Sequence, residues 1–437
     1  MTGIEIAFGS ILLMLVLVYS GMHVAIALTL LSFIGVGLLR DNFDIAGNML
    51  VLAFEDSISD YLFGVVPLFV LMGLLVSVAG IGRDTFQVAA QVFRKIAGGL
   101  GIATVAANAI FAAITGISIA SAAVFTKVAV PEMVKHGYTP KFAVGVVAGS
   151  SVLGMLIPPS LLFIIYGVLT EQSVGALFIA GVIPGLLLAA SYCVGILFMA
   201  RFTPGFIGRL ADATDTPPTL TLIEVVSKIT PIVLLVALVL GGIYGGVFTP
   251  TEAGAAGAMG ALIIALVKRR LSWGDFWQVL VQTGHITASI CILIIGASLY
   301  SRMLAMSGMP AWLGTAVAEA GIGPNGTVLL LLLAMVVLGT ILDSASIMLL
   351  TLPIVLPVLT GAGVDLIWLG VLSILAVEIG LLTPPFGIAV FVIKATLGPD
   401  STVTLGQIFR GAAPFAAIMI MVLLLVFLFP WLATALV

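Results

Sequence analysis

The chain consists mostly of long apolar runs separated by short polar segments. Because a run of about 20 apolar residues can span a bilayer as a helix, this pattern predicts an all-α polytopic membrane protein with about eleven transmembrane helices. Residues 41–60 mix acidic and apolar positions, which favours a helix lying in the membrane interface. Residues 204–227 are the clearest polar stretch and are expected to form a linker.

Two apolar blocks do not fit a scheme of simple spans. Residues 98–136 and 324–361 are each too long for one span and too short for two spans with a loop. If each block crossed the membrane once, the basic residues of the polar segments would no longer fall on one side. Both blocks are therefore predicted to be re-entrant hairpins, which enter the membrane and return to the same side.

Basic residues set the predicted orientation. Lys268, Arg269 and Arg270 lie in a short loop, which the positive-inside rule places in the cytoplasm. If the hairpins do not cross, only Arg40 and Arg302 lie clearly outside this bias. The basic residues that share the cytoplasmic side are Arg83, Arg94, Lys95, Lys135, Lys141, Arg201, Arg209, Lys228, Lys394 and Arg410.

An internal repeat links the hairpins to two proline pairs. The segments GMLIPPSLLF, with Pro158-Pro159, and GLLTPPFGIA, with Pro384-Pro385, each interrupt an apolar run. The shift that places Pro158 on Pro384, called the repeat offset below, also places Pro131 on Pro357 and TGISIAS on ILDSASI. Five predicted crossings separate the hairpins, so the two copies are inverted relative to each other, as in many secondary transporters.

The proline pairs would break their helices inside the membrane. A proline removes one backbone donor, and an unpaired backbone group is tolerated in lipid only where protein, water or a ligand satisfies it. Carbonyls near 154–157 and 380–383 would lose their intrahelical donors and would suit Na⁺. The N-termini of the half-helices and hairpins would direct positive charge at the same centre, which suits an anionic substrate. The alternative is plain kinks filled by neighbouring helices.

The composition excludes several other classes of protein. Hydrophobic residues make up 62% of the chain and charged residues 8%, a ratio that no soluble domain needs. The net charge of −3 comes without a basic patch, so nothing indicates nucleic-acid binding. Cys193 and Cys291 lie in apolar runs and are expected to be core residues. The chain has no HExxH motif, and a metal centre or protease site is not expected.

Three segments carry a resemblance to a known family: VAGSSVLGMLIPPSLLFIIYGVLTEQSVGALFIAGVIPG (147–185), TILDSASIMLLTLPIVLPV and LLTPPFGIAVFV. They resemble the large membrane subunit of TRAP transporters, the DctM type, over essentially the whole chain. The resemblance implies an elevator-type, Na⁺-coupled importer of organic acid anions (dicarboxylates, sugar acids, sialic acid or keto acids) in the bacterial inner membrane. It also implies a small four-helix membrane subunit (Q) and a periplasmic substrate-binding protein (P) as partners.

The resemblance implies roles for individual residues as well. The family often has serines where this chain has Thr115 and Ile117, and an asparagine where it has Ala389. These differences bear on substrate class more than on mechanism. The implied Na⁺ ligands are Thr115, Gly154, Ile157 and Pro159 in the first half and Thr383 and Gly387 in the second. The implied substrate contacts are Ser118, Ser150, Ser151, Asp343 and Ser344.

The predicted domain organisation follows the repeat. Residues 98–170 and 324–396, each a hairpin plus a broken helix, would form the moving transport unit. Residues 1–97, 171–323 and 397–437 would form the scaffold against which that unit slides.

Two acidic residues and the function itself allow alternatives. Asp343 would contact hydroxyls or a cation, or would hold a backbone N–H group. Glu378 would ligate a cation or relay a proton, or pair with a hydroxyl or an arginine. The nearest alternative function is a self-sufficient Na⁺- or H⁺-coupled anion carrier. An intramembrane enzyme would need a paired catalytic constellation, which the sequence does not show, and a passive channel usually assembles from several symmetric chains.

Overall fold

The computed structural model describes residues 2–59, 61–208 and 220–437, and within these ranges all regular structure is helical. This confirms the predicted fold class. Helices satisfy their own backbone groups, which is why long apolar segments adopt them in a membrane. Residues 209–219 of the predicted linker 204–227, Arg209 included, lie outside the described residues.

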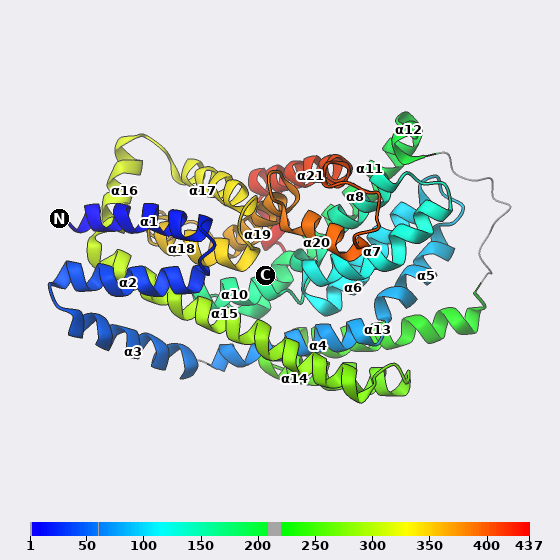
Figure 1. Ribbon diagram of the computed structural model, residues 1–437, viewed down its shortest axis with the longest axis horizontal. Helices are drawn as coiled ribbons and strands as arrows, with labels where there is room; N and C mark the ends of the chain where they lie inside the picture. Colours follow the sequence, from blue (N-terminus) through cyan, green and yellow to red (C-terminus); the bar gives the residue numbers. More distant parts are fainter. Residues whose placement is uncertain (1, 60, 209–219) are drawn as a thin grey trace.

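The first half of the chain contains the helices labelled in blue to green in Figure 1. They are α1 (Gly3–Tyr19), α2 (Val24–Arg40), α3 (Phe43–Ser59), the 3₁₀ turn η1 (Tyr61–Gly64), α4 (Val65–Val78), α5 (Ile81–Phe93), α6 (Gly99–Thr115), α7 (Ser118–Lys135), α8 (Pro140–Ser151), α9 (Leu153–Leu156), α10 (Leu161–Thr170) and α11 (Val174–Phe202).

The short helix α12 (Pro204–Ile207) precedes the second half. That half contains α13 (Leu222–Tyr244), α14 (Pro250–Val267), α15 (Trp273–Ser307), α16 (Met309–Glu319), α17 (Pro324–Gly339), α18 (Ser344–Gly361), α19 (Leu366–Leu382), α20 (Ile388–Leu397), α21 (Leu405–Leu428) and α22 (Trp431–Thr434).

The helix boundaries repeat along the chain. At the repeat offset, α7 coincides with α18, and α8 together with α9 coincides with α19. The same shift places α1, α2, α5, α6, α10 and α11 on α13, α14, α16, α17, α20 and α21, while α3 and α4 fall on the long α15. Most of these boundaries agree within about two residues, the ordinary uncertainty of a helix end. The repeat is therefore larger than predicted, because it includes the outer helices as well as the hairpins and broken helices.

Both predicted breaks are present, and helix pairs lie where both hairpins are predicted; the re-entry of the hairpins into the membrane stays a prediction. Helices α6 and α7 form the first hairpin, and α17 and α18 form the second. The proline pairs interrupt the helices between Leu156 and Leu161 and between Leu382 and Ile388, and both Pro-Pro peptide bonds are cis. The sequence thus located the two interruptions correctly.

Not all the predicted spans are single straight helices. In the described part of the chain, six helices are long and apolar enough to cross a membrane, or nine if each bent pair counts as one span. The helix pair α4 and α5 bends by 60°, and α8–α9 and α10 bend by 41° at the first break. The total of about eleven spans stays a prediction. Residues 43–59 are helical as expected, and the interfacial position of α3 stays a prediction too.

Several of the outer helices lie side by side and pack against the hairpins. Helix α4 packs against α14 and α15, and these helices lie together with α13 along one side of the molecule in Figure 1. The hairpins and broken helices lie above them, with α10, α19 and α20 near the middle. Helices α1, α13, α14, α15 and α21 each begin with a capping box, in which a threonine or serine and an acidic or amide side chain satisfy free N–H groups.

Candidate functional site

The tip of the first hairpin touches the first break through backbone atoms. Gly116, which has a φ of 62°, turns the chain between α6 and α7, and its carbonyl oxygen accepts a hydrogen bond from the Leu161 N–H at 3.2 Å. A methyl group added at Gly116 would lie 2.6 Å from the Pro159 carbonyl oxygen. A methyl group at Gly154 would lie 3.1 Å from the Ile117 carbonyl. The structure therefore brings together the Thr115–Ser118 turn, Gly154 and Pro159, as expected.

The side chains of Thr115 and Ile157, both in the first predicted Na⁺ site, have different surroundings. The Thr115 hydroxyl donates to the Phe111 carbonyl at 3.0 Å, which leaves its lone pairs available to a ligand. Ile157 lies on the side of the break that faces α11, because its side chain and backbone would meet a methyl group added at Gly185. Its backbone is part of the break, but its side chain packs against α11.

The second break gathers carbonyl oxygens around Gly387. The Thr340 carbonyl accepts hydrogen bonds from the N–H groups of Phe386 and Gly387, both at 3.2 Å. A methyl group added at Gly387, where φ is 50°, would lie 3.1 Å from the Leu381 oxygen and 3.2 Å from the Thr383 oxygen. The Thr383 hydroxyl donates to the Ile379 carbonyl. The second tip and second break thus meet as the repeat predicts, and they present the oxygen atoms that Na⁺ prefers.

Two of the predicted substrate residues occupy equivalent places in the repeat. Ser118 is the first residue of α7 and Ser344 the first residue of α18, and the repeat offset places one on the other. Both are buried and both lie beside the carboxyl group of Glu378, whose Oε1 accepts a hydrogen bond from the Ser344 hydroxyl at 2.9 Å. The structure therefore brings the two tips to one acidic side chain.

Asp343 has a clear local role. It is the N-cap of α18, and its side chain accepts a hydrogen bond from the Ser346 N–H at 3.1 Å and another from the Ser346 hydroxyl. This matches the expectation that it holds a backbone N–H group. The first tip differs, because Ile117 is the N-cap of α7 and offers no side-chain oxygen.

Ser150 and Ser151 are buried in α8 and donate to carbonyls of their own helix, Val146 at 2.7 Å and Ala148 at 2.8 Å. Ser150 also accepts a hydrogen bond from the Asn108 side chain at 2.6 Å. The sequence reasoning missed Asn108, which links the first hairpin to the first broken helix. Its signal was a single amide in an otherwise apolar helix, and its Oδ1 has no hydrogen-bond partner among the described residues.

A charged cluster lies at the bend between α4 and α5, away from the tips. The Asp84 carboxylate is buried and pairs with Lys228 at 3.4 Å, with Arg270 at 3.0 Å, and with Lys268. Arg270 also donates to the Ala79 carbonyl at 3.0 Å. Burial acts to raise the pKa of Asp84, but Lys268 and Arg270 outweigh it and hold that pKa below its ordinary value.

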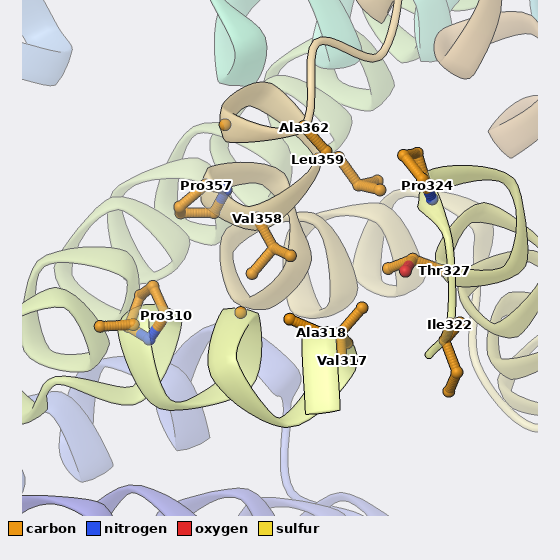
Figure 2. A pocket seen from close by; sticks show the side chains of 13 residues that line it. Pro310, Val317, Ala318, Ile322, Pro324, Thr327, Pro357, Val358, Leu359 and Ala362 are labelled. Carbon is orange, nitrogen blue, oxygen red and sulfur yellow. The ribbon is translucent and has the colours of Figure 1, made fainter. Parts of the chain in front are cut away.

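A cavity of about 480 Å³ lies at the corresponding place of the second half. Figure 2 shows Pro310 and Ala318 of α16 on one side of it and Pro357 and Val358 of α18 on the other. Its lining is mostly apolar and contains none of the predicted site residues. The cavity marks a gap between α16 and the base of the second hairpin and does not coincide with the two breaks.

Over the described residues, no group of three or more histidine, cysteine, aspartate or glutamate side chains could hold a metal ion. The oxygen atoms at the breaks suit a monovalent cation instead. A family model described as "Tripartite ATP-independent periplasmic transporter, DctM component" matches residues 11–432. This chain belongs to that family. It is therefore a TRAP transporter large permease component and a multi-pass membrane protein.

Curated relatives and solved structures agree with this assignment. The chain is 34% identical over 90% of both chains to the C4-dicarboxylate TRAP transporter large permease protein DctM of Pseudomonas aeruginosa. It is 32% identical to the sialic acid TRAP transporter large permease protein SiaM of Vibrio cholerae, over 97% of this chain and 96% of that one. The YdaH transporter of Alcanivorax borkumensis shares the fold, with a TM-score of 0.58, 16% identity and 90% coverage of each chain.

Proposed function

We propose that this TRAP permease imports an organic acid anion across the bacterial inner membrane and couples the import to a Na⁺ gradient by an elevator movement. In this proposal a periplasmic substrate-binding protein delivers the anion, and a small four-helix membrane subunit completes the complex. The observation that carries the proposal is the pair of repeated breaks, each joined by backbone hydrogen bonding to the tip of its own hairpin.

The breaks support Na⁺ coupling through their oxygen atoms. At the second break the Leu381 and Thr383 carbonyls converge near Gly387, and at the first the Pro159 carbonyl faces Gly116. Na⁺ supplies positive charge and accepts several oxygen ligands, so its binding would fix each tip against its break. Ordering of the tips by the ion would favour substrate binding at the same tips, which is a linkage between the two ligands.

The first tip supports an anionic substrate. Helix α7 begins without a capping side chain, so the N–H groups of its first turn remain available, and the Ser118 hydroxyl beside them has no hydrogen-bond partner among the described residues. The names of the relatives give C4-dicarboxylate, sialic acid, isethionate and ectoine as their substrates, and each of these compounds carries an acid group. An organic acid anion fits both observations.

The packing refines the proposed moving unit. Helix α21 packs along α8 so closely that a methyl group added at Gly145 would overlap the Gly411 backbone. Helix α11 packs against α9, α19 and α21. On this packing we place α11 and α21 with the hairpins and broken helices in the proposed moving unit. This differs from the predicted boundaries, which gave residues 171–323 and 397–437 to the scaffold.

Uptake by proteoliposomes tests the proposal. The vesicles would hold this chain with its small subunit, and radiolabelled succinate, sialic acid, isethionate and ectoine would be offered with the cognate binding protein. One of these four compounds is expected to accumulate only with an inward Na⁺ gradient and only with the binding protein. Accumulation without the binding protein would favour a self-sufficient carrier, and accumulation without Na⁺ would overturn the coupling.

A further inference from the structure

Glu378 is a buried carboxyl group that the proposed Na⁺ sites at the breaks do not use. It lies in α19 with 1% of its surface exposed. Its Oε1 accepts a hydrogen bond from the Ser344 hydroxyl, and its Oε2 has no hydrogen-bond partner in the described residues. Burying a carboxylate carries a large desolvation penalty that one hydrogen bond does not offset, so Glu378 is ionised only if a partner balances its charge.

No basic side chain supplies that charge. The ion pairs found among the described residues involve Glu132, Asp84 and Asp56, and none involves Glu378. The other titratable side chain beside Glu378 is Tyr192 of α11, whose hydroxyl donates to the Met419 sulfur at 3.5 Å. The charge of the carboxylate is therefore not balanced by the protein in the described part of the chain.

The surrounding hydroxyl groups point to a ligand with several coordination positions. Ser118 is 2% exposed and lies beside the Glu378 carboxyl group, and its hydroxyl forms no hydrogen bond of ordinary geometry with the described residues. Ser121 lies one turn later on the same face of α7 and is fully buried. Its hydroxyl also has no hydrogen-bond partner among the described residues. Buried polar atoms without partners require an explanation, and an ion is one that accounts for several of them together.

We infer that Glu378, with Ser118 and Ser344, forms a monovalent-cation site that bridges the two hairpin tips. One carboxylate and neutral hydroxyls carry a charge of −1, which a monovalent cation neutralises and a divalent cation would exceed. The repeat supports a site distinct from the two breaks, because the counterpart of Glu378 at the repeat offset is Val152. The site is therefore present once, where the two halves meet. The inference rests on the proposed function only in taking Na⁺ as the ion.

Equilibrium binding of radiolabelled Na⁺ to the purified full chain tests this site. Glu378→Gln keeps the shape of the side chain and removes its charge, so it is expected to bind about one Na⁺ fewer than the unmodified protein. Ser118→Ala is expected to weaken one binding component by about tenfold, or 1.4 kcal/mol. Ser373→Ala removes another buried, unpartnered hydroxyl from α19 and is expected to bind Na⁺ as the unmodified protein does.

Two results would overturn the inference. One is unchanged Na⁺ binding in both Glu378→Gln and Ser118→Ala. The other is unchanged Na⁺ binding together with loss of a pH-dependent change in melting temperature in Glu378→Gln, which would show that Glu378 carries a proton. Thr115→Ala and Thr383→Ala separate this site from the proposed ones. If they leave Na⁺ binding unchanged while Glu378→Gln reduces it, the break sites fail and the bridging site stands.

Discussion

The two breaks have the same sequence pattern but different surroundings. All residues from 151 to 160 are buried, and Ser160 is 0% exposed. At the second break Pro384, Pro385 and Phe386 are exposed, with Phe386, the repeat counterpart of Ser160, at 47%. One half of the molecule encloses its break and the other leaves it open. Under the proposed inverted topology, two halves with different conformations are what alternating access requires.

The bends that precede the two hairpins differ in a similar way, because the first is packed more tightly than the second. The bend before the first hairpin is fixed by the Asp84 cluster, and α5 packs closely along α6. The repeat counterpart of Asp84 is Pro310, which lines the cavity between α16 and α18 (Figure 2). The first bend is therefore held by charge and the second is loosely packed. The difference shows that the repeat conserves the path of the chain but not its packing.

The largest expected effect is at the first bend. Asp84→Asn leaves three basic groups around a neutral amide, and loss of a buried ion-pair partner costs about 3 kcal/mol. Melting in detergent at pH 7 measures it. Asp56→Asn is the control, because Asp56 is 61% exposed in its ion pair with Arg302 and is expected to lose less than about 1 kcal/mol. Equal losses in the two variants would contradict a special role for the first bend.

The stability difference between Asp84→Asn and the unmodified protein is expected to depend on pH. The pKa of Asp84 is lower in the folded protein than its ordinary value of 3.8. Its stabilisation is therefore complete above about pH 4 and is lost as the pH falls through the folded-state pKa. The difference in melting temperature between Asp84→Asn and the unmodified protein should be constant from pH 7 to about pH 5 and shrink below pH 4. A difference that already shrinks at pH 6 would contradict the assignment.

The second effect tests the enclosed first break. Gly116→Ala is expected to destabilise the protein by about 2–3 kcal/mol, because the methyl group meets the Pro159 oxygen and the residue has a positive φ. Gly308→Ala has a similar left-handed backbone, with a φ of 80°, but in open space, and is expected to lose about 1 kcal/mol. Melting temperatures compare the two variants, and an equal loss would show that tip and break are not in contact.

The third effect measures the openness of the two breaks directly. In a chain with Cys193→Ala and Cys291→Ala, Phe386→Cys is expected to react with a small maleimide at least about tenfold faster than Ser160→Cys, because Ser160 reacts only after local opening. The labelling rates in detergent give this ratio. Similar rates would remove the asymmetry on which the comparison rests.

The smallest effect on stability is expected at the cavity. Gly314→Leu would place a side chain in the gap between α16 and α18 and should change the stability by less than about 1 kcal/mol. It should slow uptake, because the gap must close if α16 approaches the second hairpin. Gly47→Leu on α3, which also has open space around it, is the control. Uptake at the rate of the unmodified protein in both variants would show that the gap does not change.

Much of the fold followed from local patterns in the sequence. The proline pairs located both breaks. The repeat offset placed Ser118 and Ser344 at equivalent positions, and in the structure both lie beside Glu378. These features are local: both adjacent proline pairs interrupt their helices, whereas a single proline such as Pro131 lies inside a continuous helix.

The contacts between distant segments could not be predicted in this way. The sequence singled out Glu378 as an acidic residue in an apolar run, but only the folded chain shows that both tips meet there. Asp84 pairs with residues 144 to 186 positions away, and no spacing rule connects them. The extent of the repeat was also missed, because the outer helices share boundaries but no motif.

Thermal unfolding in Na⁺, compared with equal concentrations of K⁺ and choline, tests the central claim most directly. A ligand that binds only the folded state at a hundred times its Kd adds about 2.7 kcal/mol of stability. The account predicts a Na⁺-specific rise in melting temperature that is reduced in Thr115→Ala and Thr383→Ala. It predicts an unreduced rise in Thr126→Ala, which removes a similar buried hydroxyl far from the tip. The same melting temperature in all three salts would contradict Na⁺ binding at the breaks.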